Sequence, residues 1–191
     1  PTGVQKYMII DGQQRMTTLT LLLLALRDYA IKNPGDTTIN ARRIDNMLLK
    51  NEYENGDERY KLLLTETDRD ILISLVEEKP IAEGTRSRLI ENYNFFANKL
   101  ADKEIQLAEV YESIGKLQIV NITLDRAVDD AQAIFESLNS TGKELSESDL
   151  IRNYVLMGLE PSEQTYVYEH LWRPMEQLFI YETQGSVMDA F

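Results

Sequence analysis

The opening of the chain combines a short apolar run with a long Leu-rich stretch. Residues 6–10, KYMII, lie between a glycine and an Asp-Gly pair, which predicts a buried strand that enters a tight turn. Residues 15 to about 32 are rich in Leu and Ala, and the NPG at residues 33–35 is a stop signal, so we expect a helix there. Because apolar residues cover nearly every face of this segment, the helix is predicted to be central and buried on several sides.

The rest of the pattern is mainly helical. Apolar residues recur at helical spacing in most segments. Thr67 stands three residues before Asp70, a capping signature that predicts a helix start at Thr67. The predicted helices cover residues 38–50, 67–79, 89–100, 107–114, 129–139 and 146–159, with a last helix after Pro161, and two further strands cover residues 60–64 and 118–124. The sequence therefore predicts an α+β fold of about eight helices and about three short strands, without an internal repeat.

Composition narrows the class of protein. The 191 residues are 43% hydrophobic and 27% charged and include no cysteine, which is typical of a soluble globular protein without disulfides or thiolate metal sites. The absence of cysteine also fits a reducing compartment, so we expect a cytoplasmic location. The longest apolar run, residues 21–26, is far shorter than the roughly 20 residues that span a bilayer. A membrane role is therefore not expected.

Charge is distributed unevenly along the chain. The net charge of −12 argues against a uniformly basic clamp for nucleic acid. Residues 1–50 nevertheless hold seven Lys or Arg and four Asp or Glu, so this stretch carries +3 and the remainder −15. The chain begins at Pro1 without a signal-like segment and stops at Phe191 in a stretch that reads as ordered. We therefore interpret it as a fragment of a longer protein.

The turn at Asp11-Gly12 is a favourable place to bind an anion. The first turn of a helix leaves backbone N–H groups free, and the helix dipole adds partial positive charge there. Gly12 lets a ligand approach the backbone, and Arg15 offers a bidentate fork suited to phosphate. Thr17 and Thr18 could donate to phosphate or help hold a divalent ion, while Asp11 could cap the helix, bind a metal through water or orient an attacking water. An ordinary helix start, with Asp11 as cap and Arg15 as a surface charge, explains the same residues about equally well.

Two separate motifs carry a resemblance to a known family. The segment IIDGQQRMTTL, residues 9–19, is similar to the DGQQR signature of the N-terminal domain of GmrSD-type modification-dependent restriction endonucleases, a branch of the ParB and sulfiredoxin-like fold. A second block, residues 133–154, resembles the other hallmark segment of that family, and the intervening RYKLLLTETD, residues 59–68, also fits. With these segments together the resemblance covers most of the chain, and two separate motifs in the right order make it specific.

The resemblance implies a nucleotide-binding and NTP-hydrolysing domain that couples NTP use to recognition of modified DNA in defence against phage. NTP with Mg²⁺ is the implied cofactor, and the nuclease would lie in a domain or subunit outside this chain. The catalytic residues implied in this way are Asp11, Gln13, Gln14 and Arg15. The expected nucleotide-binding residues are Gly12, Arg15, Thr17, Thr18, Asn139 and Arg152, and Asp11 is the expected metal ligand.

The resemblance also implies a small ParB/sulfiredoxin-like sheet packed with the helices. We expect this sheet to be incomplete at its N-terminal side, because a further strand and motif of the family would precede Pro1. Residues 1–125 would form a ParB-like nucleotide-binding region with a helical insertion. Residues 126–191 would form a helical region that packs on it, or would continue it as one domain.

Residues of the second block have plain structural explanations as well. A connection between two helices explains Asn139 as well as a position facing the phosphate loop does, and Asp149 could pair with Arg152 on the same helix. The single histidine, His170, stands on a predicted helix, where a lone histidine is more often structural than catalytic. We therefore assign no DNA cleavage to this chain.

Three functions remain open at this point. The chain could be an NTP-hydrolysing regulatory module, a non-catalytic module that binds DNA or nucleotide phosphate, or a helical scaffold. No Walker-type G-x-x-x-x-G-K-[ST] run is present, so hydrolysis would depend on Asp11, Gln13 or Gln14 to position water. Assembly into a homo-oligomer is left open as well.

Overall fold

The computed structural model describes most of the first two thirds of the chain. The described residues are 3–9, 11–36, 38–64, 66–102 and 104–124, together with 134, 151, 154–155, 159, 163, 166–172 and 174–175. The chain divides into two compact units, Pro1–Val120 and Asn121–Phe191. The first unit contains the DGQQR loop, residues 11–15.

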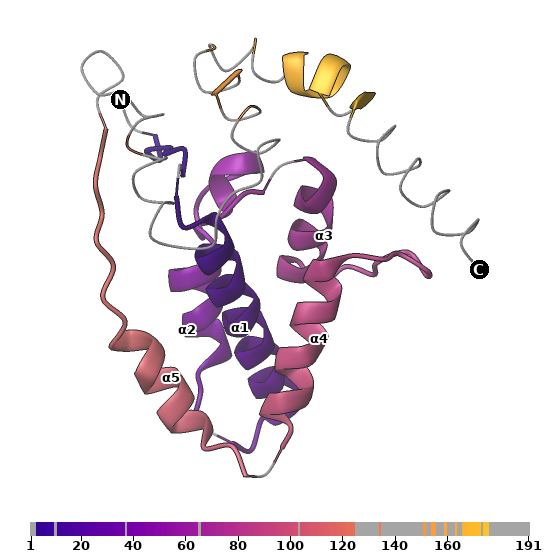
Figure 1. Cartoon of the computed structure of the whole chain (residues 1–191). Coiled ribbons are helices and arrows are strands. Elements are labelled where there is room, and N and C mark those ends of the chain that lie inside the picture. Colours follow the sequence, from indigo (N-terminus) through magenta and orange to yellow (C-terminus); the bar gives the residue numbers. More distant parts are fainter. Residues whose placement is uncertain are drawn as a thin grey trace, which may run out of the picture. The chain divides into compact units, whose positions relative to one another are not determined.

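The long helix α1, Gln13–Lys32, is the central element of the first unit. It lies between α2 and α4 (Figure 1). Straight-chain Leu and Ala dominate its sequence and lose little side-chain freedom in a helix, which favours this conformation. The helix ends where the N–H of Asn33 donates to the Tyr29 carbonyl, and Lys32 in the last turn complements the helix dipole. The predicted helix of residues 15–32 is thereby confirmed, with its start two residues earlier.

Shorter helical elements surround α1. Helix α2, Ala41–Ile44, continues directly into a π-helix, η1, Asp45–Leu49. The Asn40 side chain accepts the N–H of Arg43 at the start of α2, and the Ser87 hydroxyl accepts the N–H of Leu89 at the start of α4. The further elements are the 3-10 helix η2, Gly56–Arg59, the α-helices α3, Glu66–Val76, α4, Arg88–Leu100, and α5, Leu107–Gly115, and in the second unit the π-helix η3, Tyr168–Trp172.

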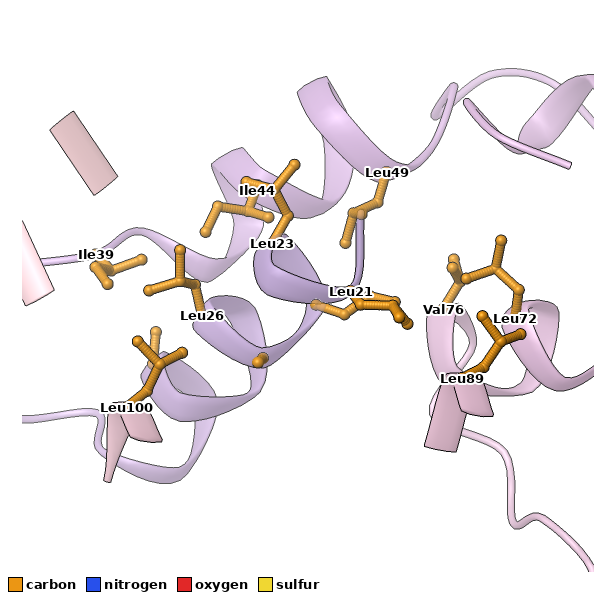
Figure 2. Packing of buried hydrophobic residues seen from close by; sticks show 13 residues of the cluster. Leu21, Leu23, Leu26, Ile39, Ile44, Leu49, Leu72, Val76, Leu89 and Leu100 are labelled. Carbon is orange, nitrogen blue, oxygen red and sulfur yellow. The ribbon is translucent and has the colours of Figure 1, made fainter. Parts of the chain in front are cut away.

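The hydrophobic core follows α1 along both of its sides. Leu24 and Leu26 are fully buried, as is Ile44 of α2. On one side Leu26 lies near Ile39 and Leu100, and on the other Leu21 faces α3 and α4 (Figure 2). Buried side chains thus come from α1, α2, η1, α3 and α4, so the position of α1 is set by packing on several sides.

The predicted sheet is wrong for the part of the chain that the structure describes. Backbone pairing there amounts to one isolated antiparallel bridge between Lys50 and Tyr60, and no strand is present. Residues 4–9 and 118–124 are neither helix nor strand, and Tyr7 and Val120 are 66% and 85% exposed. A strand needs a neighbouring backbone to satisfy its N–H and C=O groups, and an apolar pattern alone does not supply one. The fold described is therefore helical, and a ParB-like sheet is not seen.

The helix predictions fare better than the strands. Helices α2 with η1, α4 and α5 confirm the predictions for residues 38–50, 89–100 and 107–114. Helix α3 confirms the prediction for residues 67–79, with its start at Glu66 and its end at Val76. Most of residues 129–139 and 146–159 lie outside the described residues. No described helix has the length and apolarity needed to cross a membrane.

A buried arginine ties α1 to its neighbours. Arg27 is 1% exposed, and its guanidinium donates to Asp28 at 2.8 Å and to Asp45 of η1 at 3.0 Å. It also donates to the carbonyl oxygens of Val76 at 2.7 Å and Leu75 at 2.9 Å, which satisfies the end of α3. Burial opposes the charge, but the hydrogen bonds and charges of the two aspartates raise the pKa of Arg27 above its ordinary value. The guanidinium therefore stays charged and holds three elements together.

Further polar and charged side chains contact the two aspartate partners of Arg27. Lys50, which is 7% exposed, contacts Asp45 at 3.0 Å and Glu77 at 3.7 Å, and Arg59 contacts Glu77 at 2.9 Å. On the α4 side, the Tyr93 hydroxyl donates to Asp28 at 2.6 Å. Burial, followed by this hydrogen bond, raises the pKa of Tyr93 above its ordinary value, so the phenol stays protonated. These residues are all engaged with one another, which is the pattern of a structural network.

Candidate functional site

The candidate site is the turn that leads into α1. Gly12 occupies the N-cap position with φ 87° and ψ 8°, the left-handed region that glycine adopts readily and other residues rarely do. The Gly12 N–H donates to Oδ1 of Asp11 at 2.6 Å. The Asp11 side chain therefore accepts the N–H of the N-cap residue, and no side chain caps the first turn of the helix. The glycine at position 12 accounts for the tight turn that was predicted here.

Asp11 and Arg15 form an exposed ion pair across the turn. Oδ2 of Asp11 lies 2.7 Å from Nη2 of Arg15, and the side chains are 36% and 75% exposed. The guanidinium lies beside Gly12, since a Cβ built on that glycine would be 3.6 Å from Nη2 of Arg15. A side chain at position 12 would therefore contact the arginine, whereas glycine leaves that space open.

The two glutamines occupy different environments. Gln13 donates from Nε2 to the Ile9 carbonyl at 2.7 Å, which links the segment before the turn to the first residue of the helix. Gln14 is exposed, and its side chain makes no hydrogen bond within the described residues. Gln13 therefore holds the loop, while the Gln14 amide is available to a ligand or to water.

Three backbone donors are free at the start of α1. The first helical hydrogen bond runs from the Met16 N–H to the Gly12 carbonyl at 2.9 Å. Within the part of the chain that the structure describes, the N–H groups of Gln13, Gln14 and Arg15 have no acceptor. Aligned free donors at a helix N-terminus, with an arginine beside them, favour a negatively charged group.

The two threonines lie one turn further along the helix. The Thr17 and Thr18 hydroxyls donate to the carbonyls of Gln13 and Gln14, both at 2.8 Å. Each hydroxyl hydrogen is thus directed at the helix backbone. A contact with phosphate or a metal would require the hydroxyl to rotate away from that carbonyl, so their expected role in nucleotide binding stays a prediction.

Other candidates are not gathered at this loop. Asn139 and Arg152 lie outside the described residues. His170 lies on η3 in the second unit, where its Nδ1 is 3.0 Å from the Tyr166 carbonyl and its ring stacks on Tyr166 with a centroid distance of 4.4 Å. Among the described residues no group of three or more His, Asp or Glu side chains could hold a metal ion. Metal binding at the loop would therefore depend on Asp11 together with ligand oxygens.

Sequence reasoning missed the residues that hold the loop in place. The bond from Gln13 to the Ile9 carbonyl reaches back across the turn at Gly12, so helical spacing does not predict it. Lys6 lies 3.4 Å from Glu58 of η2, an exposed ion pair between the segment before the turn and a distant part of the first unit. No local signal predicts a contact between residues 52 positions apart.

The amino-acid sequence matches a known protein family. Residues 1–156 match the family described as the GmrSD restriction endonuclease, N-terminal domain. The chain belongs to this family. The GmrSD family places the chain in a protein of restriction-modification and phage defence. Neither the curated proteins nor the solved structures that were compared with the chain give a significant match.

Family membership confirms the resemblance drawn from the two motifs. The match covers both the DGQQR loop and the second block at residues 133–154. The GmrSD family implies modified DNA and a nuclease domain in the full-length protein. It does not by itself assign a chemical role to Asp11, Gln13, Gln14 or Arg15, so those roles depend on the geometry of the loop.

Proposed function

We propose that the DGQQR loop of this GmrSD N-terminal domain binds the phosphates of a nucleoside triphosphate, and that the domain hydrolyses the nucleotide to regulate a cytoplasmic restriction protein. The observation that carries the proposal is the set of free N–H groups of Gln13, Gln14 and Arg15 at the start of α1, beside the exposed Arg15 guanidinium. Phosphate oxygens would accept from these donors, and Gly12 leaves room for the approach.

The residues of the loop are compatible with a magnesium nucleotide. Mg²⁺ is usually held by one or two carboxylates together with substrate phosphates, and it neutralises charge that develops on the phosphoryl group. Asp11 supplies one exposed carboxylate at the correct end of the helix. Gln14, whose amide has no partner in the described residues, would orient the attacking water, and Arg15 would hold the phosphate oxygens.

A non-catalytic binding module is the alternative. The bond from Gln13 to the Ile9 carbonyl favours it, because this bond gives the glutamine a structural role in the loop. In that case the loop would hold a nucleotide or a DNA phosphate without turnover. Modified DNA would still be recognised by the full-length protein, with a nuclease domain or subunit outside this chain, and a homo-oligomer is compatible with either function.

Calorimetric titration of ATP and GTP with Mg²⁺ into the wild-type chain and into Arg15→Ala tests the proposal. A hydrogen bond to a charged group contributes about 1.5–3 kcal/mol, so the variant should bind about tenfold more weakly or worse. Arg69→Ala is a matched control, because Arg69 also lies in the first turn of a helix and pairs with an aspartate, Asp57. Its affinity should equal that of the wild type.

The outcomes separate the three functions. Binding that is lost in Arg15→Ala and kept in Arg69→Ala supports the phosphate site. Release of inorganic phosphate by the wild type, reduced in Gln14→Ala with binding retained, supports hydrolysis, and binding without release supports the alternative. A folded wild-type chain that binds neither nucleotide, or an Arg15→Ala variant that binds as the wild type does, would overturn the proposal.

A further inference from the structure

Asp11 already occupies one of the donors that a phosphate group would use, the guanidinium of Arg15. Its two carboxylate oxygens accept from the Gly12 N–H at 2.6 Å and from Nη2 of Arg15 at 2.7 Å. The proposed phosphate site depends on this guanidinium, and the Gly12 N–H directly precedes the free N–H groups at the start of α1. A carboxylate and a phosphate cannot both take the same face of Arg15, so an incoming anion competes with Asp11.

We propose that Asp11 is an internal substitute for phosphate: an anion displaces it from Arg15, and the released carboxylate then turns to the Mg²⁺ that accompanies the nucleotide. This inference depends on the proposed function and adds a regulation of the same site. Without a divalent ion, Asp11 opposes anion binding, both by holding Arg15 and by like-charge repulsion. With Mg²⁺ present, the same carboxylate favours binding.

The exposure of the pair makes such an exchange feasible. Arg15 is 75% exposed and Asp11 36%, and ion pairs of this kind between exposed side chains are weak because water solvates both partners. The contrast on the same helix is Arg27, which is 1% exposed and engages four acceptors. The Asp11 to Arg15 pair can therefore open without disturbing the core, and the backbone donors of α1 stay in place.

Titration of inorganic pyrophosphate into Asp11→Asn and wild type, with and without Mg²⁺, tests the exchange. Asparagine keeps an oxygen for the Gly12 N–H but loses the charge that holds Arg15. Without Mg²⁺ the variant should bind pyrophosphate about three- to tenfold more tightly than the wild type, which corresponds to freeing an exposed pair and removing a neighbouring like charge. Addition of Mg²⁺ should strengthen binding to the wild type and leave the variant nearly unchanged.

A matched control and a second variant guard the interpretation. Asp36→Asn makes the same change of charge at another exposed turn, where Asp36 accepts the N–H of Thr38 and has no cation partner among the described residues. It should bind as the wild type does under both conditions. Asp11→Ser also retains a hydroxyl acceptor for the turn, and it should reproduce the behaviour of Asp11→Asn if the charge is what matters.

Failure of this inference can be distinguished from failure of the proposed function. If a folded wild type and both Asp11 variants all fail to bind pyrophosphate and magnesium nucleotide, the phosphate site itself is wrong, and the exchange with it. If the wild type binds but Asp11→Asn and Asp11→Ser bind more weakly or equally in the absence of Mg²⁺, only the exchange is overturned. Asp11 would then be a fixed part of the turn.

Discussion

Replacing Arg27 by methionine should remove the bonds that join α1, η1 and α3 while keeping an apolar side chain of similar length. In the wild type, the guanidinium satisfies the carbonyl oxygens of Leu75 and Val76 and pairs with Asp28 and Asp45. The thioether of methionine can donate to none of these four acceptors. The variant therefore tests whether a buried arginine, rather than apolar packing alone, sets the position of α1.

The expected loss can be worked out from these contacts. Breaking a buried ion pair costs about 3–5 kcal/mol, and a buried polar group left without a partner costs about 1–3 kcal/mol. Both aspartates, however, retain a second donor, since Tyr93 donates to Asp28 and Lys50 contacts Asp45. Their side chains are also 18% and 24% exposed, so water reaches them. We therefore expect Arg27→Met to lower the free energy of unfolding by about 3 kcal/mol.

Urea denaturation followed by far-UV circular dichroism measures this loss. Arg43→Met is the matched control, because Arg43 is exposed and makes no ion pair within the described residues. The control should differ from the wild type by less than about 0.5 kcal/mol. A loss below about 1 kcal/mol for Arg27→Met would refute the reasoning, since it would mean that water or packing replaces the guanidinium at little cost.

Two further predictions concern the turn and the charge network. Gly12→Ala should lower both stability and pyrophosphate affinity, because a φ of 87° costs alanine about 1–2 kcal/mol. The cost comes from the backbone, since the new Cβ would meet no atom closer than 3.6 Å. Gly35→Ala is the control and should match the wild type in both measurements. Burial opposes the charge of Glu77, but Arg59 and Lys50 together hold its pKa below the ordinary value, so its contribution to stability is present above about pH 4.3 and is lost as pH falls through the lowered pKa. Urea midpoints measured from neutral to acidic pH should therefore fall less steeply for Glu77→Gln, and an identical slope would contradict this.

Some of the helical fold could be predicted because its signals are local. The Leu-rich stretch and the NPG at residues 33–35 predicted a helix to residue 32, and α1 ends at Lys32. Apolar residues at helical spacing likewise predicted α4 and α5, although nothing in the pattern indicated that α2 continues into the π-helix η1. Asp45, the first residue of η1, contacts Arg27 of α1, and this contact between distant residues is not revealed by the sequence.

The sheet was predicted wrongly because strand formation is not a local property. Residues 6–10 and 118–124 have the apolar patterns of strands, yet in the described residues neither finds a backbone partner. The exposed Tyr7 and Ile119 show that an apolar residue in such a pattern need not be buried. Periodicity gives the face that a strand would bury, but pairing between distant segments decides whether the strand forms.

The candidate site divides in the same way between local and distant contacts. Asp11 with Arg15 and Ile9 with Gln13 are close in sequence, but Ile9 and Asp11 precede α1, so both contacts depend on the left-handed turn at Gly12. The tie between Lys6 and Glu58, in contrast, joins residues far apart in sequence and could not be read from it. The residues of the loop could therefore be predicted from the sequence, while the contact between Lys6 and Glu58 could not.

The two arginines of α1 show how one helix could serve both structure and the binding that we propose. Arg27 lies in the interior, where few water molecules compete for its acceptors, and its ion pairs fix the helix against η1 and α3. Arg15 lies at the exposed start of the same helix, where water weakens its pair with Asp11, and our proposal is that an anion replaces the carboxylate there. Because the core holds the backbone of α1 rigidly, such an exchange would move side chains only, and the free N–H groups would keep their direction.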